Sequence, residues 1–279
     1  MASPAGGSMY RFVFVSHFSP FLFEWHWLGH ALSVRWYGLA YALGFLLTFF
    51  YFRRVTRLSA VPGFDSEALE RLTIAVPVGV MLGGRLGFVA QHPHELLHDP
   101  LFVLRVWEGG MAFFGGLIGC LLALWWVARG FGGRLLALTD IAVFPAALGL
   151  GFGRIANFLN GELLGKPTGG GWGVVFPQVD SVPRHPSQLY ESASHFLLFG
   201  VLVLVSRRRP GWIGGRCGRL SFLFLTLYGL LRFLTDFYRA DDTYWGPLSD
   251  GQWTSLLVGL VGLVAYSRLS WVARNAVKE

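Results

Sequence analysis

The chain has 279 residues, of which 53% are hydrophobic and only 14% are charged. A soluble core does not need so many apolar residues, and apolar runs near the roughly twenty residues that cross a bilayer as a helix recur along the sequence. The formal net charge of +7 comes largely from basic residues between these runs, so nucleic-acid binding is not needed to explain it. The composition therefore favours an all-α integral membrane protein over a soluble domain.

The apolar runs predict seven transmembrane helices. In chain order they cover about 36–52, 72–90, 111–128, 136–158, 188–206, 219–238 and 252–271. The second and fourth runs contain Gly and Pro, so the sequence defines their ends poorly.

Basic residues gather at alternate connections, after the first, third, fifth and seventh runs. They are Arg53, Arg54, Arg57, Arg71, Arg129, Arg134, Arg207, Arg208, Arg209, Arg216, Arg219, Arg268, Arg274 and Lys278. By the positive-inside rule these connections are cytoplasmic. The amino terminus is then expected outside and the carboxyl terminus in the cytoplasm.

The chain shows no internal repeat and no linker long enough to divide it, so residues 1–279 are interpreted as one transmembrane domain. Aromatic residues near the amino terminus alternate with less apolar ones: Phe21, Phe23, Trp25 and Trp27. This alternation predicts that residues 1–35 form an arm at the outer membrane interface, with a disordered tail as the alternative. The Gly- and Pro-rich segment 161–187 is predicted to form a small outward-facing cap.

Metal and redox signatures are absent from the sequence. It contains no Cys-X-X-Cys pair, no His/Cys cluster at zinc spacing and no phosphate-loop motif. Cys120 falls within the third run and Cys217 on the cytoplasmic side, so both are predicted to be free thiols. We expect neither a metal nor a cofactor. His195, in the fifth run, is interpreted as a helix-contact histidine in preference to a proton relay.

Polar residues from six runs fall at one depth in the outer half of the predicted bundle. Arg154 and Asn157 lie three residues apart on one helix face, with Glu162 just beyond them. The other members of this layer are Tyr37, Arg85, His185, Gln188, Tyr190, Glu191, Arg232, Asp236 and Arg239.

Several arginines at one depth indicate an anion site. An arginine inside a bilayer costs roughly 2.5 to 3.5 kcal/mol on insertion scales, so it is expected to have a partner or a substrate. A guanidinium offers a planar fork of donors that suits a phosphate, and apolar surroundings suit acyl chains. The pattern predicts a phospholipid site open to the outer leaflet. The alternative is that the arginines pair with neighbouring acids and hold the bundle together, although few acids at this depth would leave positive charge uncompensated.

Six segments, in order over about 200 residues, resemble the prolipoprotein diacylglyceryl transferase (Lgt) family. They are RWYGLAYALGF (35–45), LGGRLGFV (82–89), VWEGGMAFFGGLIG (106–119), GFGRIANFLNGELLG (151–165), PRHPSQLYE (183–191) and YGLLRFLTDFYRADD (228–242).

The resemblance implies a multi-pass enzyme of the bacterial cytoplasmic (inner) membrane whose active site faces the outer leaflet. Such enzymes carry out the first step of lipoprotein maturation. They transfer the diacylglyceryl group of phosphatidylglycerol to the thiol of the lipobox cysteine in a prolipoprotein signal peptide. The products are a thioether and glycerol phosphate. The implied partners are therefore phosphatidylglycerol, the signal peptide and membrane lipids, without nucleic acid or cofactor.

The resemblance also implies roles for individual residues. Arg154 and Arg232 would bind the lipid phosphate and stabilise charge on the leaving group. Asn157 and Glu162 would organise the site, and Tyr37 would help to line it.

Three further residues are expected to contact the substrate. Asp236, in place of the family's usual glutamate, and Arg239 would lie at the outer rim. Arg85 would contribute from the outer half of the second run.

One departure from the family pattern bears on catalysis. The glycine-rich motif of the third run has Phe114 where the family usually has a histidine that is proposed as the general base. His185 or Glu162 could take that role, or the thiol could ionise in the field of the arginines. Alternatively, the chain could be a lipid-binding paralogue that transfers slowly or not at all. A lipid or anion transporter is disfavoured because its site is expected near the midplane.

Overall fold

The computed structural model describes residues 12–19, 21–27, 30–57, 66–105, 110–130, 132, 134–213, 218–240 and 243–275. The chain divides into two compact units. The first unit comprises Met1–Gly44, Val143–Arg209 and Arg219–Glu279, and the second comprises Phe45–Ala142 and Pro210–Gly218.

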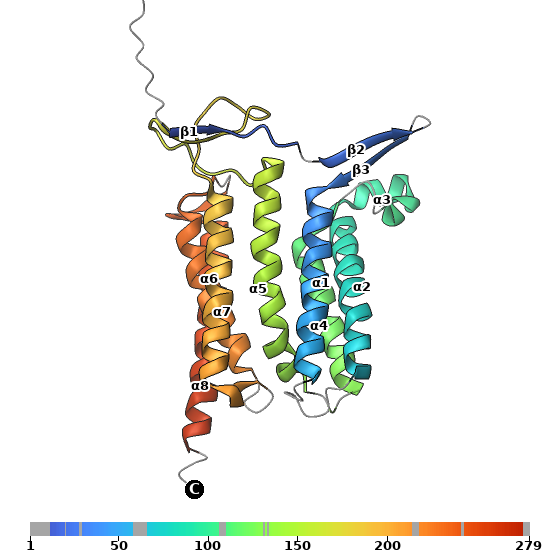
Figure 1. The fold of residues 1–279 in the computed structure, drawn as a ribbon, viewed down its shortest axis with the longest axis vertical. Helices are drawn as coiled ribbons and strands as arrows, with labels where there is room; N and C mark the ends of the chain where they lie inside the picture. The colour runs from blue at the N-terminus through green and yellow to red at the C-terminus, as the bar shows by residue number, and fades with distance from the viewer. Residues whose placement is uncertain are drawn as a thin grey trace, which may run out of the picture. The chain divides into compact units, whose positions relative to one another are not determined.

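All seven predicted runs are helical (Figure 1). The corresponding helices are α1 (Trp36–Arg57), α2 (Ser66–Gln91), α4 (Phe113–Gly130), α5 (Leu135–Asn160), α6 (Ser187–Arg208), α7 (Arg219–Asp236) and α8 (Asp250–Asn275). Shorter helical segments are α3 (Pro93–His98), η1 (Pro100–Leu104) and η3 (Pro210–Trp212).

Five helices in the described part of the chain are long and apolar enough to cross a bilayer. These stretches are Glu70–Gln91, Phe113–Gly130, Leu135–Asn160, Ser187–Arg208 and Asp250–Trp271. In α1 the apolar stretch is shorter, at Gly38–Tyr51. Helix α7 carries Arg219, Arg232 and Asp236, which lower its apolar character. The chain is thus a mainly helical, multi-pass membrane protein, and the count of seven spans stays a prediction.

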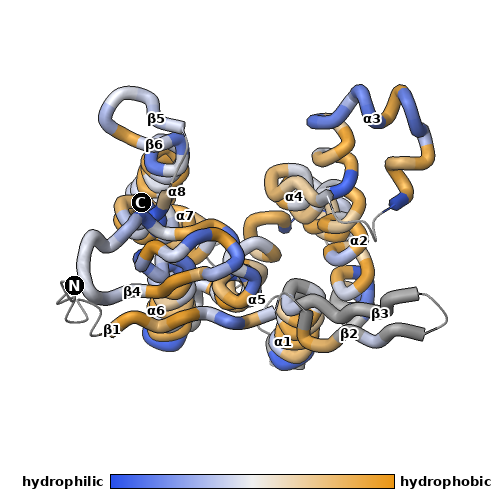
Figure 2. Tube along the Cα trace, turned by 90° about the horizontal axis from the view of Figure 1, so that it is seen from above, coloured by the Kyte–Doolittle hydropathy of each residue, from blue (hydrophilic) through white to orange (hydrophobic). Residues whose placement is uncertain are grey.

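The strictly all-α prediction missed three two-stranded sheets. Strand β1 (Phe12–Val15) pairs in parallel with β4 (Trp172–Val175), and the two lie side by side in Figure 2. Strands β2 (Phe21–Trp27) and β3 (His30–Arg35) form an antiparallel pair, as do β5 (Tyr244–Trp245) and β6 (Leu248–Ser249). Aromatic and β-branched residues favour extended backbone, which explains strands within the predicted arm. Residues 1–11 of that arm lie outside the described residues, and its interfacial position stays a prediction.

In the second unit, glycines let α2 and α4 pack with their backbones in close approach. A methyl group added to Gly119 would lie 1.9 Å from the carbonyl oxygen of Gly79, and one added to Gly115 would lie 2.2 Å from that of Gly83. Only small residues permit such an approach.

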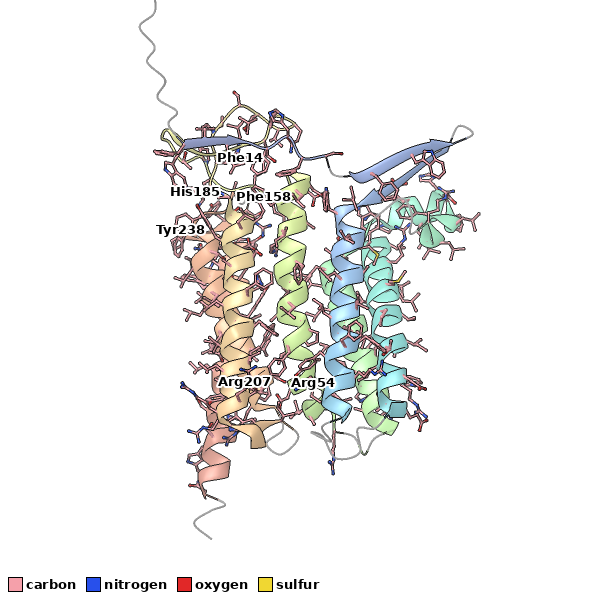
Figure 3. All side chains as sticks on the ribbon, in the orientation of Figure 1. Phe14, Arg54, Phe158, His185, Arg207 and Tyr238 are labelled. Carbon is pink, nitrogen blue, oxygen red and sulfur yellow. The ribbon has the colours of Figure 1, made fainter. Side chains whose placement is uncertain are left out.

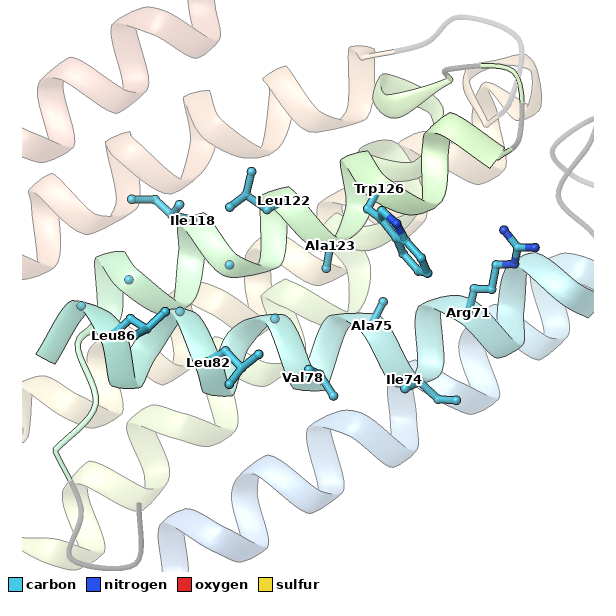
Figure 4. A pocket seen from close by; sticks show the side chains of 15 residues that line it. Arg71, Ile74, Ala75, Val78, Leu82, Leu86, Ile118, Leu122, Ala123 and Trp126 are labelled. Carbon is cyan, nitrogen blue, oxygen red and sulfur yellow. The ribbon is translucent and has the colours of Figure 1, made fainter. Parts of the chain in front are cut away.

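An apolar groove runs along the α2–α4 pair (Figure 4). Its volume is about 840 Å³, and its lining is apolar apart from Arg71. Arg71 is already paired with Glu67 one helical turn away, at 2.5 Å. The groove therefore presents apolar side chains and no free polar cluster.

In the first unit, the segment from Gly161 to Pro186 is well structured and joins the ends of α5, α6 and α7. The backbone N–H of Lys166 donates to the carbonyl of Tyr238, and that of Ala240 donates to the carbonyl of Leu164. Phe158, Val174 and Phe176 form a small buried core beneath the segment. The predicted cap segment is thus anchored to three helices, which matters because the polar residues described next lie at the same helix ends.

Candidate functional site

Glu191 on α6 lies at the centre of the polar residues. Its side chain is only 1% exposed. Its Oε2 lies 2.7 Å from Nε of Arg154 on α5, and its Oε1 lies 3.1 Å from Nη1 of Arg232 on α7. Arg239, just beyond α7, approaches Oε1 at 3.9 Å. One buried carboxylate thus gathers three guanidinium groups, which together are called the arginine cluster below.

A chain of amide and carboxylate contacts extends from Arg154. Its Nη1 donates to Oδ1 of Asn157 at 3.2 Å, and Nδ2 of Asn157 donates to Oε2 of Glu162 at 3.2 Å. Asn157 is buried whereas Glu162 is exposed. This arrangement fixes the plane of the Arg154 guanidinium and fits the organising role expected for Asn157 and Glu162.

Asp236 holds Arg232 from the other side. Its Oδ1 lies 2.6 Å from Nη1 of Arg232, one helical turn earlier, and Oδ2 accepts a hydrogen bond from the hydroxyl of Ser249. The Asp236 side chain is buried, and its place at the outer rim of the site stays a prediction. Burial follows from its place between α7 and the start of α8, where Gly251 leaves room for the carboxylate.

Side-chain bonds to backbone carbonyls join the end of α5, which carries Arg154, to the start of α6, which carries Glu191. The Gln188 amide donates to the carbonyl of Glu162 at 2.6 Å, and the Ser187 hydroxyl donates to that of Leu163 at 3.3 Å. Leu163 has a φ of 52°, a conformation that costs a non-glycine residue energy unless its surroundings enforce it. These contacts hold the end of α5 against the start of α6.

His185 lies in an aromatic group at the same ends of the helices. Its ring centroid is 5.0 Å from that of Trp172 and 5.0 Å from that of Tyr238, and Nδ1 lies 3.3 Å from the hydroxyl of Tyr190. Figure 3 shows His185, Tyr238 and Phe158 at one end of this unit and Arg207 at the other. The contacts described for His185 are therefore aromatic and do not involve the arginine cluster.

His195 and Tyr228 lie deeper in the same unit. His195 is buried one turn after Glu191 on α6, and its ring centroid is 5.6 Å from that of Tyr228 on α7. Neither residue was in the site predicted from the sequence. Sequence analysis included Glu191 in the polar layer but gave it no role in the site, although an acid within an apolar helix was a usable signal.

Arg85 belongs to the second unit, so its position relative to the arginine cluster is not defined. Its guanidinium donates to the carbonyls of Val103 and Gly110 at 3.1 and 3.2 Å, and also to that of Phe102. It also lies over the rings of Phe88 and Phe102. These contacts attach the connection after α2 to the helix, and a binding role for Arg85 stays a prediction.

Two further residues remain to be placed. The side chain of Tyr37, at the start of α1, lies outside the described residues. Phe114 lies in the first turn of α4 and is exposed, with its ring against that of Phe113. The position where the family usually has a histidine is therefore occupied by an exposed phenylalanine. A buried histidine, His195, lies in the first unit.

The expectation of uncompensated positive charge was wrong in part. Two buried acids, Glu191 and Asp236, lie among the three arginines. Donors nevertheless remain, because a guanidinium has five N–H groups. Among the described residues, the side-chain contacts of Arg232 all use Nη1 and those of Arg154 use Nε and Nη1. The site can therefore accept an anion without losing its internal ion pairs.

These features define a class: a polytopic helical membrane protein that buries a cluster of arginines and carboxylates among apolar helices. The comparisons with known proteins give the family. The sequence model of the family described as prolipoprotein diacylglyceryl transferase matches residues 25–268.

Similar proteins cover nearly the whole chain. A protein of Geobacter sulfurreducens named phosphatidylglycerol–prolipoprotein diacylglyceryl transferase is 42% identical over 254 residues, 88% of this chain and 94% of its own length. Proteins of the same name from Polynucleobacter asymbioticus and Cupriavidus pinatubonensis are 39% and 41% identical, over 86% and 89% of this chain and 93% and 90% of their own lengths. The chain belongs to the prolipoprotein diacylglyceryl transferase family.

Proposed function

We propose that this protein transfers the diacylglyceryl group of phosphatidylglycerol to the lipobox cysteine of a prolipoprotein signal peptide. Family membership and the names of the similar proteins support the reaction and both substrates. The observation that carries the proposal within the molecule is the convergence of Arg154, Arg232 and Arg239 on Glu191 inside an apolar bundle.

The proposed chemistry is displacement at carbon with a phosphate ester as the leaving group. The lipid phosphate binds the remaining donors of Arg154 and Arg232, and fixed positive charge stabilises the glycerol phosphate as it departs. Glu191 and Asp236 keep the guanidinium groups in place before the lipid arrives, so little reorganisation is needed when charge develops. Asn157 and Glu162 orient Arg154, Arg239 contributes a third positive charge, and Tyr37 contributes to the proposed lining.

The proposed topology has seven spans in a single transmembrane domain of the bacterial cytoplasmic membrane, with the amino terminus outside. Arg207 and Arg208 lie at the opposite end of α6 from Glu191, and basic ends face the cytoplasm. The arginine cluster then lies towards the outer leaflet. Residues 161–187 cover it as an outward-facing cap, and residues 1–35 lie along the interface.

The test is transfer of labelled diacylglyceryl from phosphatidylglycerol to a lipobox peptide by the purified protein. Arg154→Ala and Arg232→Ala should each lower kcat/KM by roughly 100-fold or more, the loss typical of one transition-state donor. Arg71→Ala, which removes an exposed arginine paired with Glu67, serves as the matched control and should retain activity. Full activity of both cluster variants would refute the proposal.

Phe114 favours one second candidate, a lipid-binding paralogue without efficient transfer. The same assay separates the two functions when the native chain is compared with Phe114→His. Product from the native chain rejects the paralogue, whereas product from Phe114→His alone would establish it.

A further inference from the structure

His195 differs from an ordinary helix-contact histidine in how it is bonded. Nδ1 bonds to the carbonyl of Glu191, four residues earlier on its own helix, so it makes no link between helices through that nitrogen. The contact between α5 and α6 is made nearby by the Ser192 hydroxyl, which donates to the carbonyl of Gly151 at 2.9 Å. The ring packs against Tyr228 of α7, as expected of a helix-contact histidine, whereas neither ring nitrogen bonds to another helix among the described residues.

The bond to Glu191 fixes the tautomer of the ring. A carbonyl oxygen can only accept a hydrogen bond, so Nδ1 carries the hydrogen and Nε2 of the neutral ring holds a lone pair. Nε2 is buried and has no hydrogen-bond partner among the described residues. A buried polar atom without a hydrogen-bond partner lowers stability, so an acceptor is kept there at the expense of stability.

Charged and titratable groups from each neighbouring helix face this ring. They are Glu191 on α6 itself, Arg154 from α5, and Arg232 and Tyr228 from α7. The basic nitrogen is therefore adjacent to the arginine cluster without being ion-paired to it.

If the proposed function holds, His195 lies on the side from which the thiol must attack the glyceryl carbon. A nucleophile displaces a leaving group from the side opposite to it. With the phosphate held at the level of Glu191, the glyceryl carbon and acyl chains extend deeper into the bundle. His195 lies four residues further along α6, about 6 Å on that deeper side.

We propose that Nε2 of His195 is the general base that accepts the proton of the incoming cysteine thiol. The sulfur forms a bond to the glyceryl carbon while the bond from that carbon to the phosphate oxygen breaks, and the electron pair leaves with the glycerol phosphate. The proton passes from sulfur to Nε2 and then to the departing phosphate monoester or to water. No oxidant, reductant or further reactant is needed.

The test uses His195→Asn in the full chain, because the asparagine amide can keep the bond to the Glu191 carbonyl while Nε2 is removed. We expect kcat to fall by about 100-fold or more, the contribution of a typical general base, with KM for phosphatidylglycerol little changed. The native rate should fall in acid as the imidazole is protonated. In the variant this decrease in acid should be absent, and the rate should instead vary with the fraction of the substrate thiol that is ionised.

A second variant covers a loss of activity caused by misfolding. In His195→Ala, added imidazole should restore part of the rate, more at high pH than at low pH, because only neutral imidazole accepts a proton. His94→Gln, which alters an exposed histidine of α3, is the control and should leave the pH profile unchanged.

The outcomes separate this inference from the proposed function. If the native protein forms product and His195→Asn retains both its kcat and its acid limb, the base is another group and the inference is wrong. A loss of activity in His195→Ala that imidazole does not restore, with an unchanged profile in His195→Asn, also overturns it. A native protein that forms no product refutes the proposed function itself.

Discussion

The α2–α4 pair and the helices α5, α6 and α7 keep helices together in lipid by opposite means. In the first, glycines bring two backbones so close that no side chain fits between them, and the adjoining groove is apolar. In the second, Glu191 joins Arg154 and Arg232 from two different helices.

The difference shows where a polar reaction can be placed in a membrane protein. The closely packed α2–α4 pair leaves an apolar groove, without a cluster of hydrogen-bond donors in its lining that could hold an anion. Ion pairs between helices stabilise less efficiently, because each charge loses its hydration on burial. They do, however, keep guanidinium groups at fixed positions, with donors remaining for an anion.

The largest effect on the ion-paired helices is expected from Glu191→Gln. Removing one partner of a buried ion pair typically costs about 3–5 kcal/mol, because the remaining charges are left uncompensated. We expect a large loss of thermal stability in detergent. Transfer should also fall by more than about 100-fold, because the guanidinium groups separate.

The matched control for Glu191→Gln is Glu67→Gln on α2. Glu67 pairs with Arg71 on the surface, where such a pair contributes little. Stability and transfer should both stay near the native values. If the two variants behaved alike, Glu191 would not be the centre of the site.

A smaller effect is expected for Gly119→Ala in the α2–α4 pair. The added methyl group would meet the carbonyl of Gly79, so the helices must move apart, at a cost of about 1–3 kcal/mol for overpacking. Thermal unfolding should shift downwards while kcat/KM of the folded fraction is retained.

Gly200→Ala on α6 is the matched control, because it makes the same substitution at a position where the added methyl group has space. No atom lies within 4 Å of the added methyl group, so the substitution should be neutral or slightly stabilising. A loss of activity without a loss of stability in Gly119→Ala would contradict the division between packing and chemistry.

The smallest effect concerns the cap segment. Hydrogen bonding from Arg184, 2.5 Å away, lowers the pKa of the Asp180 carboxyl below its ordinary value. A lowered pKa stabilises the folded state at neutral pH, and this contribution is lost as pH falls through the lowered value. Asp180→Asn should therefore be slightly less stable than the native protein at neutral pH.

The difference in stability between Asp180→Asn and the native protein should begin to shrink at about pH 4, the ordinary pKa of an aspartate, and disappear below the lowered pKa of the folded state. Thermal unfolding followed across pH measures this. A difference that persists in acid would show that Asp180 acts by packing and not through its charge.

Hydrophobic runs predicted the helices well, because helix formation depends on local sequence. The sequence also placed Arg154, Arg232 and Glu191 in one polar layer, and their side chains meet in the structure. The sequence did not show what joins them, because Glu191 bridges residues 37 and 41 positions away and no local pattern specifies such a bond. The burial of Asp236 was not predicted for the same reason, because it depends on Ser249 of β6 and Gly251 of α8.

The strands were missed because they are short and their partners are remote. Strand β1 pairs with β4, about 160 residues later, and four residues of alternating sequence cannot identify that partner. The sequence also could not show that Nε2 of His195 has no hydrogen-bond partner among the described residues, because hydrogen bonding depends on the tertiary structure.

The short stretch from Glu162 to Lys166 fixes the distance between the end of α5 and the end of α7. Its backbone bonds to Tyr238, Ala240 and Gln188 set the separation of Arg154 and Arg232. Adding or deleting a single residue there would change that separation, whereas the exposed turn at Gly169 has open space around it. A reporter peptide for locating the cap segment belongs at Gly169, where lengthening the chain does not disturb the arginines.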